Sequence, residues 1–291
     1  PEESNKQDAP GGAAGAAAKQ FLQPPSTEEM GLMTPWEAEL QRYRVQLVPS
    51  AEELRANPCA EKTLYFIRHA ESMSNVYNHQ MRDGNPCACC KLCAVGFDAD
   101  VSDEGRRQLL SVRKDCQKIM PQLEAILHSP LKRTEETAAT TFGKADPSGS
   151  FSKGSSEGEV PWISLLCLKE EMLEEHVQEP GCNCLSGHRV KRKAPAHTKS
   201  PKFRRRIEHF LHFAWDCRWS RFAVVGHSLW FRCMMCIAAP ASGAMCVRNA
   251  ALWKLTLVAP TALGQLPQIT HWEEVVAPSR SDSDIRSKET E

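Results

Sequence analysis

The residues Thr63-Leu64-Tyr65-Phe66-Ile67-Arg68-His69-Ala70-Glu71-Ser72 decide the fold of this chain. They open with five residues of apolar and β-branched character, a run that predicts a short buried strand. Arg68 and His69 follow where such a strand is expected to end. In an open parallel sheet ligands bind at the carboxyl ends of strands, so this pair is a candidate binding site. An Arg-His pair is also common on solvated surfaces, and three later stretches decide between the two interpretations.

The composition indicates one substantial core and no excess of charge. The chain has 291 residues, 36 basic and 36 acidic, and 41% of its residues are hydrophobic. This balance gives no argument for nucleic acid as a partner, and no apolar stretch is long enough to cross a membrane. Its 13 cysteines are an odd number without the regular spacing of a disulfide framework. We therefore expect a reduced, intracellular setting, with the cytoplasm as the first choice.

Three segments are expected along the chain. Residues 1–35 are rich in Ala, Gly, Pro and Gln and are predicted to be disordered, as is the charged, Ser-rich tail 277–291. The N-terminal segment has no apolar core flanked by basic residues, which argues against a secretory signal. Residues 36–276 are expected to form a single domain.

Strand and helix patterns alternate through that domain. Strands are predicted at 63–67, 123–128, 162–168, 221–225 and 252–258, the last of them at an edge of the sheet. Helices are predicted at 35–43, 102–120, 134–142, 203–217 and from 229 onward. The stretches 71–100 and 143–160 are expected to be irregular. This alternation predicts a three-layer α/β/α domain with a mainly parallel sheet.

Basic residues follow three of the predicted strands. Arg68-His69 comes after the first strand, Arg133 after the second and His227 after the strand 221–225. Because the carboxyl ends of parallel strands share one edge of a sheet, these side chains are expected to converge on one pocket. A tetrahedral dianion suits such a pocket, since arginines bind phosphate oxygens in pairs and helix N-termini add backbone donors. One neutral histidine is then available to attack phosphorus, and the other to stabilise charge.

The same residues resemble the motifs of the histidine phosphatase superfamily, the phosphoglycerate mutase-like proteins. Four segments carry the resemblance in the family's order. They are Leu64–Ser72 (Arg-His-Gly motif), Asp98–Gln108 (Asp-x-x-Leu-Ser-x-x-Gly-x-x-Gln), Ser129–Ala138 (second arginine motif) and Val225–Ser228 (second histidine motif). Ala70 stands where the family usually has glycine, and Val101 where it has leucine. Together the motifs imply a phosphoglycerate mutase-like fold over about residues 60 to 260.

The resemblance also implies a mechanism without metal or cofactor. His69 is the implied phosphoryl acceptor. The implied phosphate-binding side chains are Arg68, Asn75, Arg133 and His227. The family's proton donor is an acidic residue on a loop after the third strand, where this chain has an acidic run. Within that run Glu171 is favoured, Glu170 is second, and Glu174 and Glu175 are further candidates.

The expected activity is hydrolysis of a phosphomonoester, either a phosphorylated small molecule or a phosphoprotein. A phosphoglycerate-type mutase ranks lower, because the long Cys-rich and basic loops do not suggest a compact glycolytic pocket. A non-catalytic phospho-ligand binding protein is disfavoured by the retained nucleophile and arginines. Substrate identity depends on loops whose shapes the sequence does not give.

Two further features leave alternatives open. Cys87–Cys93 holds four thiols, and Cys182 and Cys184 lie in another loop. Zinc, as part of a metal-dependent regulatory module, is one possibility. The spacing lacks two separated Cys-x-x-Cys arms, however, so loop thiols are the default and no metal is predicted. The basic run 189–206 is compatible with nuclear targeting, with attraction of a polyanionic substrate, or with a solvated loop.

Overall fold

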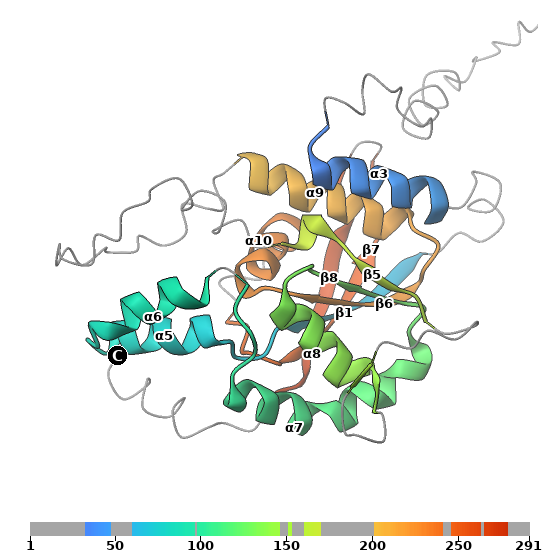
Figure 1. Cartoon of the computed structure of the whole chain (residues 1–291). Coiled ribbons are helices and arrows are strands. Elements are labelled where there is room, and N and C mark those ends of the chain that lie inside the picture. The colour runs from blue at the N-terminus through green and yellow to red at the C-terminus, as the bar shows by residue number, and fades with distance from the viewer. Residues whose placement is uncertain are drawn as a thin grey trace, which may run out of the picture.

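A computed structural model describes the chain over residues 33–47, 60–96, 98–145, 151–152, 160–169, 201–240, 246–262 and 265–278 (Figure 1). Four segments with sequence-based predictions lie outside these ranges: the N-terminal 32 residues, the acidic run from Glu170, most of the basic run 189–206 and the tail from residue 279.

The described domain is built on a six-stranded sheet in the order β5-β2-β6-β1-β7-β8. The strands are β1 (Glu61–Arg68), β2 (Ala125–His128), β5 (Trp162–Ser164), β6 (Arg221–Gly226), β7 (Leu252–Val258) and β8 (Gln268–Val276). β1 runs parallel to β6, and β2 runs parallel to both β6 and β5. β7 is antiparallel to its neighbours β1 and β8. The predicted mainly parallel sheet is confirmed.

The alternation of side chains along β1 divides the core into two clusters. Leu64 and Phe66 pack into one cluster, whereas Tyr65 and Ile67 pack into the other, and all four are buried. Successive side chains of a strand point to opposite faces, so a continuous apolar run requires cover on both sides. That requirement explains why the stretch that opens the domain becomes a central strand.

Helices supply this cover in two layers (Figure 1). α7 (Asp103–Ile119) and α8 (Lys132–Phe142) lie on one face of the sheet. α3 (Pro35–Leu47), α9 (Pro201–Asp216) and α10 (Ser228–Ala238) lie on the other. The buried face of α9 carries apolar residues at helical spacing, including Phe203, Ile207 and Phe210. The three-layer α/β/α arrangement is thus confirmed.

The helix α3, which the sequence predicted over 35–43, packs onto the domain. Leu40 is buried, and Trp36 and Tyr43 pack against the same cluster. Its residue Glu37 also forms an ion pair with Arg205 of α9, 2.9 Å apart. Part of the basic run is therefore used within the fold: Arg204 likewise pairs with Glu208.

The prediction that residues 71–100 are irregular was wrong. They contain two helices, α5 (Met73–Arg82) and α6 (Cys87–Val95), which pack against each other. Asn75 caps α5, since its Oδ1 accepts a hydrogen bond of 3.1 Å from the backbone of Ser72. α6 ends at Gly96, whose φ of 66° suits glycine. Ala88 is the buried residue of α6, so the sequence carries little of the amphipathic pattern that predicts a helix.

Three smaller predictions also need correction. The strand 252–258 is not at the edge, because β8 pairs along its outer side. The third strand stops at Ser164, and a 3₁₀ turn, η2 (Leu166–Leu168), takes the rest of its predicted length. Within the expected linker 143–160, β3 (Lys144–Ala145) and β4 (Phe151–Ser152) form a small antiparallel pair. Short turns and an edge strand with only one buried face give weak signals in the sequence.

In the described ranges, we find no helix with both the length and the apolar character needed to cross a membrane.

Candidate active site

The two histidines are brought together by the register of β1 and β6. Arg68 at the end of β1 lies opposite Gly226 at the end of β6, so His69 and His227 leave the sheet side by side. The backbone N–H of His69 donates to the carbonyl of Gly226 over 2.9 Å. The centroids of the two imidazole rings are 5.1 Å apart, with the ring planes tilted by 59°.

Arg133 reaches the same edge from the neighbouring strand. β2 is parallel to β6, and Arg133 lies in the first turn of α8, shortly after β2 ends. The side chain is buried, with 4% of its surface exposed. α8 also supports the loop that follows β1, because Thr137 Oγ1 accepts a hydrogen bond of 3.1 Å from the backbone of Ala70. The predicted convergence of Arg68, His69, Arg133 and His227 at one sheet edge is therefore observed.

The hydrogen bonds of His69 determine its tautomer. Its Nδ1 lies 2.7 Å from the carbonyl oxygen of Ala70. A carbonyl oxygen only accepts, so Nδ1 carries the proton and Nε2 of the neutral ring carries the lone pair. Asn249 donates through Nδ2 to the carbonyl oxygen of His69 over 3.0 Å and so fixes the main chain at the same point.

Both histidines are held in the neutral form. Burial lowers the pKa of His69 well below the ordinary value of 6.5, and the positive charges of Arg133 and Arg68 lower it further. The pKa of His227 is lowered well below that value for the same reasons: burial first, then Arg133 and His69. An imidazole that stays neutral near pH 7 keeps its lone pair available for a nucleophilic role.

The segment Ser102–Gln108 holds the loop after His69 in place. The hydroxyl of Ser102 donates to Glu71 Oε1 over 2.7 Å and accepts from the backbone of Gly105 over 3.0 Å, capping α7. Gln108 accepts a hydrogen bond of 3.1 Å from the backbone of Glu71. Val101, in the usual leucine position, is buried in the core as expected.

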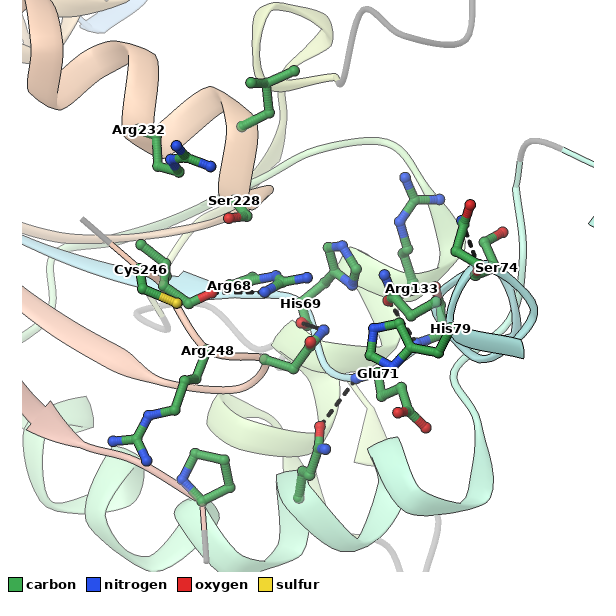
Figure 2. A pocket seen from close by; sticks show the side chains of 18 of the residues that line it. Arg68, His69, Glu71, Ser74, His79, Arg133, Ser228, Arg232, Cys246 and Arg248 are labelled. Carbon is green, nitrogen blue, oxygen red and sulfur yellow. Dashed lines mark hydrogen bonds between the residues drawn. The ribbon is translucent and has the colours of Figure 1, made fainter. Parts of the chain in front are cut away.

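A cavity of about 520 Å³ opens beside His69. Arg68 and Arg133 line it (Figure 2). Asn75 is a further lining residue. His227 is fully buried next to His69 and is not among the lining side chains. The Oδ1 atom of Asn75 accepts hydrogen bonds from Ser72 in the cap of α5, which leaves the amide NH₂ group as the part of Asn75 that can donate to a ligand. The favoured proton donor Glu171 and its alternative Glu170 lie outside the described residues.

Several lining residues were not predicted from the sequence. They come from α5, from the first turns of α10 and from the segment before β7, namely Ser74, Asn78, His79, Arg82, Ser228, Leu229, Arg232, Cys246, Val247 and Arg248. The carbonyl of Val247 accepts a hydrogen bond of 2.6 Å from Arg68, which draws this segment to the site. The sequence does contain an indication that Arg232 lies near the site. Arg232 follows Ser228 by four residues, so the two lie on the same face of α10.

The cysteines of Cys87–Cys93 lie on α6 rather than in a loop. Within the described residues no group of three or more His, Cys, Asp or Glu side chains is placed to hold a metal ion. Cys182 and Cys184 fall outside those residues.

Two histidines and two arginines gathered at one edge of a three-layer α/β domain have the chemistry to bind an anion such as phosphate. The family model of the histidine phosphatase superfamily (branch 1) matches residues 64–259, which is most of the chain. This protein belongs to that superfamily.

Similar proteins are phosphatases and mutases. The phosphoglycerate mutase-like protein 1 of Arabidopsis thaliana is 33% identical over 84 residues, a match that spans 28% of either chain. The solved phosphoserine phosphatase of Entamoeba histolytica, in complex with 3-phosphoglyceric acid, is 16% identical with a TM-score of 0.41, covering 73% of this chain and 97% of that one. The phosphoglycerate mutase of Bacillus anthracis str. Sterne is 15% identical with a TM-score of 0.43, covering 80% and 98%. Because both TM-scores are below 0.5, these structures carry no weight in the family assignment. The assignment rests on the match of the family model to residues 64–259. It indicates an enzyme of the phosphatase or mutase type that acts on phosphate groups.

Proposed function

We propose that this protein hydrolyses phosphomonoesters through a phosphohistidine at His69. The observation that carries the proposal is the contact of 2.7 Å between Nδ1 of His69 and the carbonyl oxygen of Ala70, from which we infer the tautomer of the ring. Its proton is on Nδ1, where it bonds to Ala70, and its Nε2 lone pair belongs to a neutral ring beside two arginines. Such a ring is a nucleophile at neutral pH, and guanidinium groups bind and neutralise the oxygens of a transferring phosphoryl group.

In the proposed first step, Nε2 of His69 attacks phosphorus and the bond from phosphorus to the ester oxygen breaks. Arg68 and Arg133 bind the equatorial oxygens as charge develops on them, and His227 stabilises the same charge. Glu171, or Glu170, gives its proton to the departing oxygen, so that an alcohol leaves.

In the proposed second step, a water molecule gives its proton to the carboxylate and attacks the phosphohistidine. The phosphorus–nitrogen bond breaks, inorganic phosphate leaves, and both His69 and the acid return to their starting states. In a mutase a hydroxyl group of the bound organic molecule would take the place of that water. The two activities differ in whether inorganic phosphate is released.

The direct test is p-nitrophenyl phosphate hydrolysis by wild type, His69→Ala and His271→Ala. His271 is an exposed histidine on β8 that does not line the cavity, so it is the matched control. We expect turnover in wild type and His271→Ala and its loss in His69→Ala. Rapid quench in alkaline SDS with a ³²P-labelled substrate should trap a phosphoenzyme only where His69 is present, and treatment with acid should then release the label. If the protein converts 3-phosphoglycerate to an isomer without releasing inorganic phosphate, the protein is a mutase and not a hydrolase.

No turnover and no acid-labile phosphoenzyme in wild type, over a panel of phosphomonoesters, would overturn the catalytic proposal and leave a phospho-ligand binding protein.

A further inference from the structure

The cavity beside His69 carries more positive charge than a single phosphate group requires. Beyond Arg68 and Arg133, three further arginines line it, and Glu71 is the one carboxylate among the described lining residues. Its volume of about 520 Å³ is many times the ~30 Å³ that a water molecule occupies in the liquid, so a phosphoryl group fills only a small part. The remaining space and charge call for a larger, anionic ligand.

The three further arginines are not equivalent. Arg248 forms an ion pair with Glu274, so its charge is already balanced within the fold. Arg82 lies exposed at the end of α5, where solvent screens it. Arg232 is partly buried in the wall of the cavity, and no carboxylate of the described residues pairs with it. A partly buried guanidinium gains most from an anionic partner, because burial has already removed part of its hydration.

Arg232 lies on the face of α10 that is turned toward the cavity. Ser228 is the first residue of α10, whose N-cap is His227, and it lines the cavity. Arg232 follows four residues later, so it lies on the same helix face, about 5–6 Å further along. Figure 2 shows both side chains on the same side of the cavity as Arg68, away from Glu71 and His79.

We infer that Arg232 binds a second anionic group of the substrate and thereby determines specificity. The inference rests on the proposed function and narrows it to one class of substrate. That class is a compact phosphomonoester that carries a carboxylate or a second phosphate besides the phosphoryl group transferred to His69. A guanidinium group binds either anion through two parallel hydrogen bonds, so the chemistry of Arg232 is shared by the two.

The test compares substrates that differ in the second group alone. Glycerol 3-phosphate and 3-phosphoglycerate differ by a carboxylate, and 1,3-propanediol monophosphate and 1,3-propanediol bisphosphate differ by a phosphate. The measured quantity is the ratio of kcat/KM within each pair for wild type, Arg232→Gln and Arg232→Lys. We expect Arg232→Gln to reduce the ratio roughly 10- to 100-fold, as for a lost charge-assisted hydrogen bond. Arg232→Lys should restore part of it, and the pair with the larger change identifies the anion.

The matched control is Arg221→Gln, because Arg221 is an exposed arginine at the opposite end of the sheet, where β6 begins. This variant should leave both ratios as in wild type. A general defect in folding or in phosphate binding lowers kcat/KM for both members of a pair and leaves their ratio unchanged. An unchanged ratio in Arg232→Gln would therefore overturn the inference.

A binding measurement separates this inference from the proposed function. Calorimetry with His69→Ala gives the Kd of 3-phosphoglycerate and of glycerol 3-phosphate without any turnover. If adding Arg232→Gln reduces the preference for 3-phosphoglycerate about tenfold or more, Arg232 binds the second anion even where hydrolysis fails. No change in that preference, together with none for the bisphosphate pair, would overturn the inference while hydrolysis by wild type still stands.

Discussion

The hydroxyl of Ser129 lies 3.0 Å from Nε2 of His227, and both residues are fully buried. Ser129 follows β2 directly, and its backbone N–H donates to Val225 of β6 over 3.1 Å. The second arginine motif therefore does more than supply Arg133, since its first residue orients the second histidine. A ring held from one nitrogen presents its other edge at a fixed angle, which is what stabilisation of a phosphoryl group requires.

Replacing Ser129 by alanine should lower kcat about 3- to 10-fold, the effect of losing one neutral hydrogen bond that orients a catalytic group. The measurement is steady-state hydrolysis of p-nitrophenyl phosphate. Thr141→Val is the control, because it also removes a fully buried hydroxyl group, on α8 and outside the cavity lining. Equal losses of kcat in the two variants would mean that Ser129 acts on stability alone.

Gly105 lies so close to the backbone carbonyl of Glu71 that an added Cβ would overlap it, and a Cβ there would also clash with Val101. Gly105→Ala should therefore lower the free energy of unfolding by roughly 1–3 kcal/mol through overpacking. Because Glu71 is two residues from His69, activity should fall as well. Urea denaturation and kcat/KM measure the two effects. The control is Leu110→Ala on the same helix, where the side chain is 56% exposed and a change within about 0.5 kcal/mol is expected.

The residues that the sequence placed correctly lie where local and long-range signals agree. The strand β1, which leads into Arg68 and His69, is apolar on both faces, and β2 and β6 carry the same pattern, so a parallel sheet follows from local composition. Once the sheet is parallel, Arg133 and His227 must meet His69 at one edge. This part of the site needed no knowledge of loops.

The rest depended on contacts between segments distant in the chain. The helices α5 and α6 were missed because their Asn, Gly and Cys content resembles a loop, although the cap at Asn75 was visible. Val247 and Asn249 reach the site through backbone contacts with Arg68 and His69, for which no local pattern exists. Arg232 was missed for a different reason: it lies outside the four motifs, and helical spacing from Ser228 was the only indication.

The lowered pKa values of His69 and His227 predict how stability depends on pH. Below about pH 6.5 the unfolded chain binds protons that the folded histidines do not bind. The free energy of unfolding of the unliganded protein should therefore decrease as pH falls from 6.5 toward the lowered pKa values, with no contribution from this pair above 6.5. Urea denaturation at pH 5, 6 and 7 measures it.

The variant His227→Asn removes one of the two titrating groups. Its free energy of unfolding should therefore change less steeply with pH than that of wild type, by up to about 1.4 kcal/mol per pH unit. The difference between the two proteins isolates His227 from other titrating groups, including His209 and His212, whose pKa values burial also lowers. Parallel slopes would show that His227 has the same pKa in the folded and unfolded protein, which contradicts the lowered pKa inferred here.

The identity of the proton donor separates activity on poor and good leaving groups. The departing oxygen of an alkyl phosphate must be protonated, whereas a nitrophenolate leaves without a proton. Replacing the donor by glutamine should therefore lower kcat about 10²- to 10⁴-fold on the alkyl ester and far less on the nitrophenyl ester. We expect that pattern in Glu171→Gln, or in Glu170→Gln if Glu170 is the donor.

Glu71→Gln is the comparison, since Glu71 is the described carboxylate that lines the cavity and its Oε1 accepts a hydrogen bond from Ser102. Its loss should be similar on both esters, because it holds the loop of His69 in place. A selective loss in Glu71→Gln alone would make Glu71 the donor and remove that role from the acidic run.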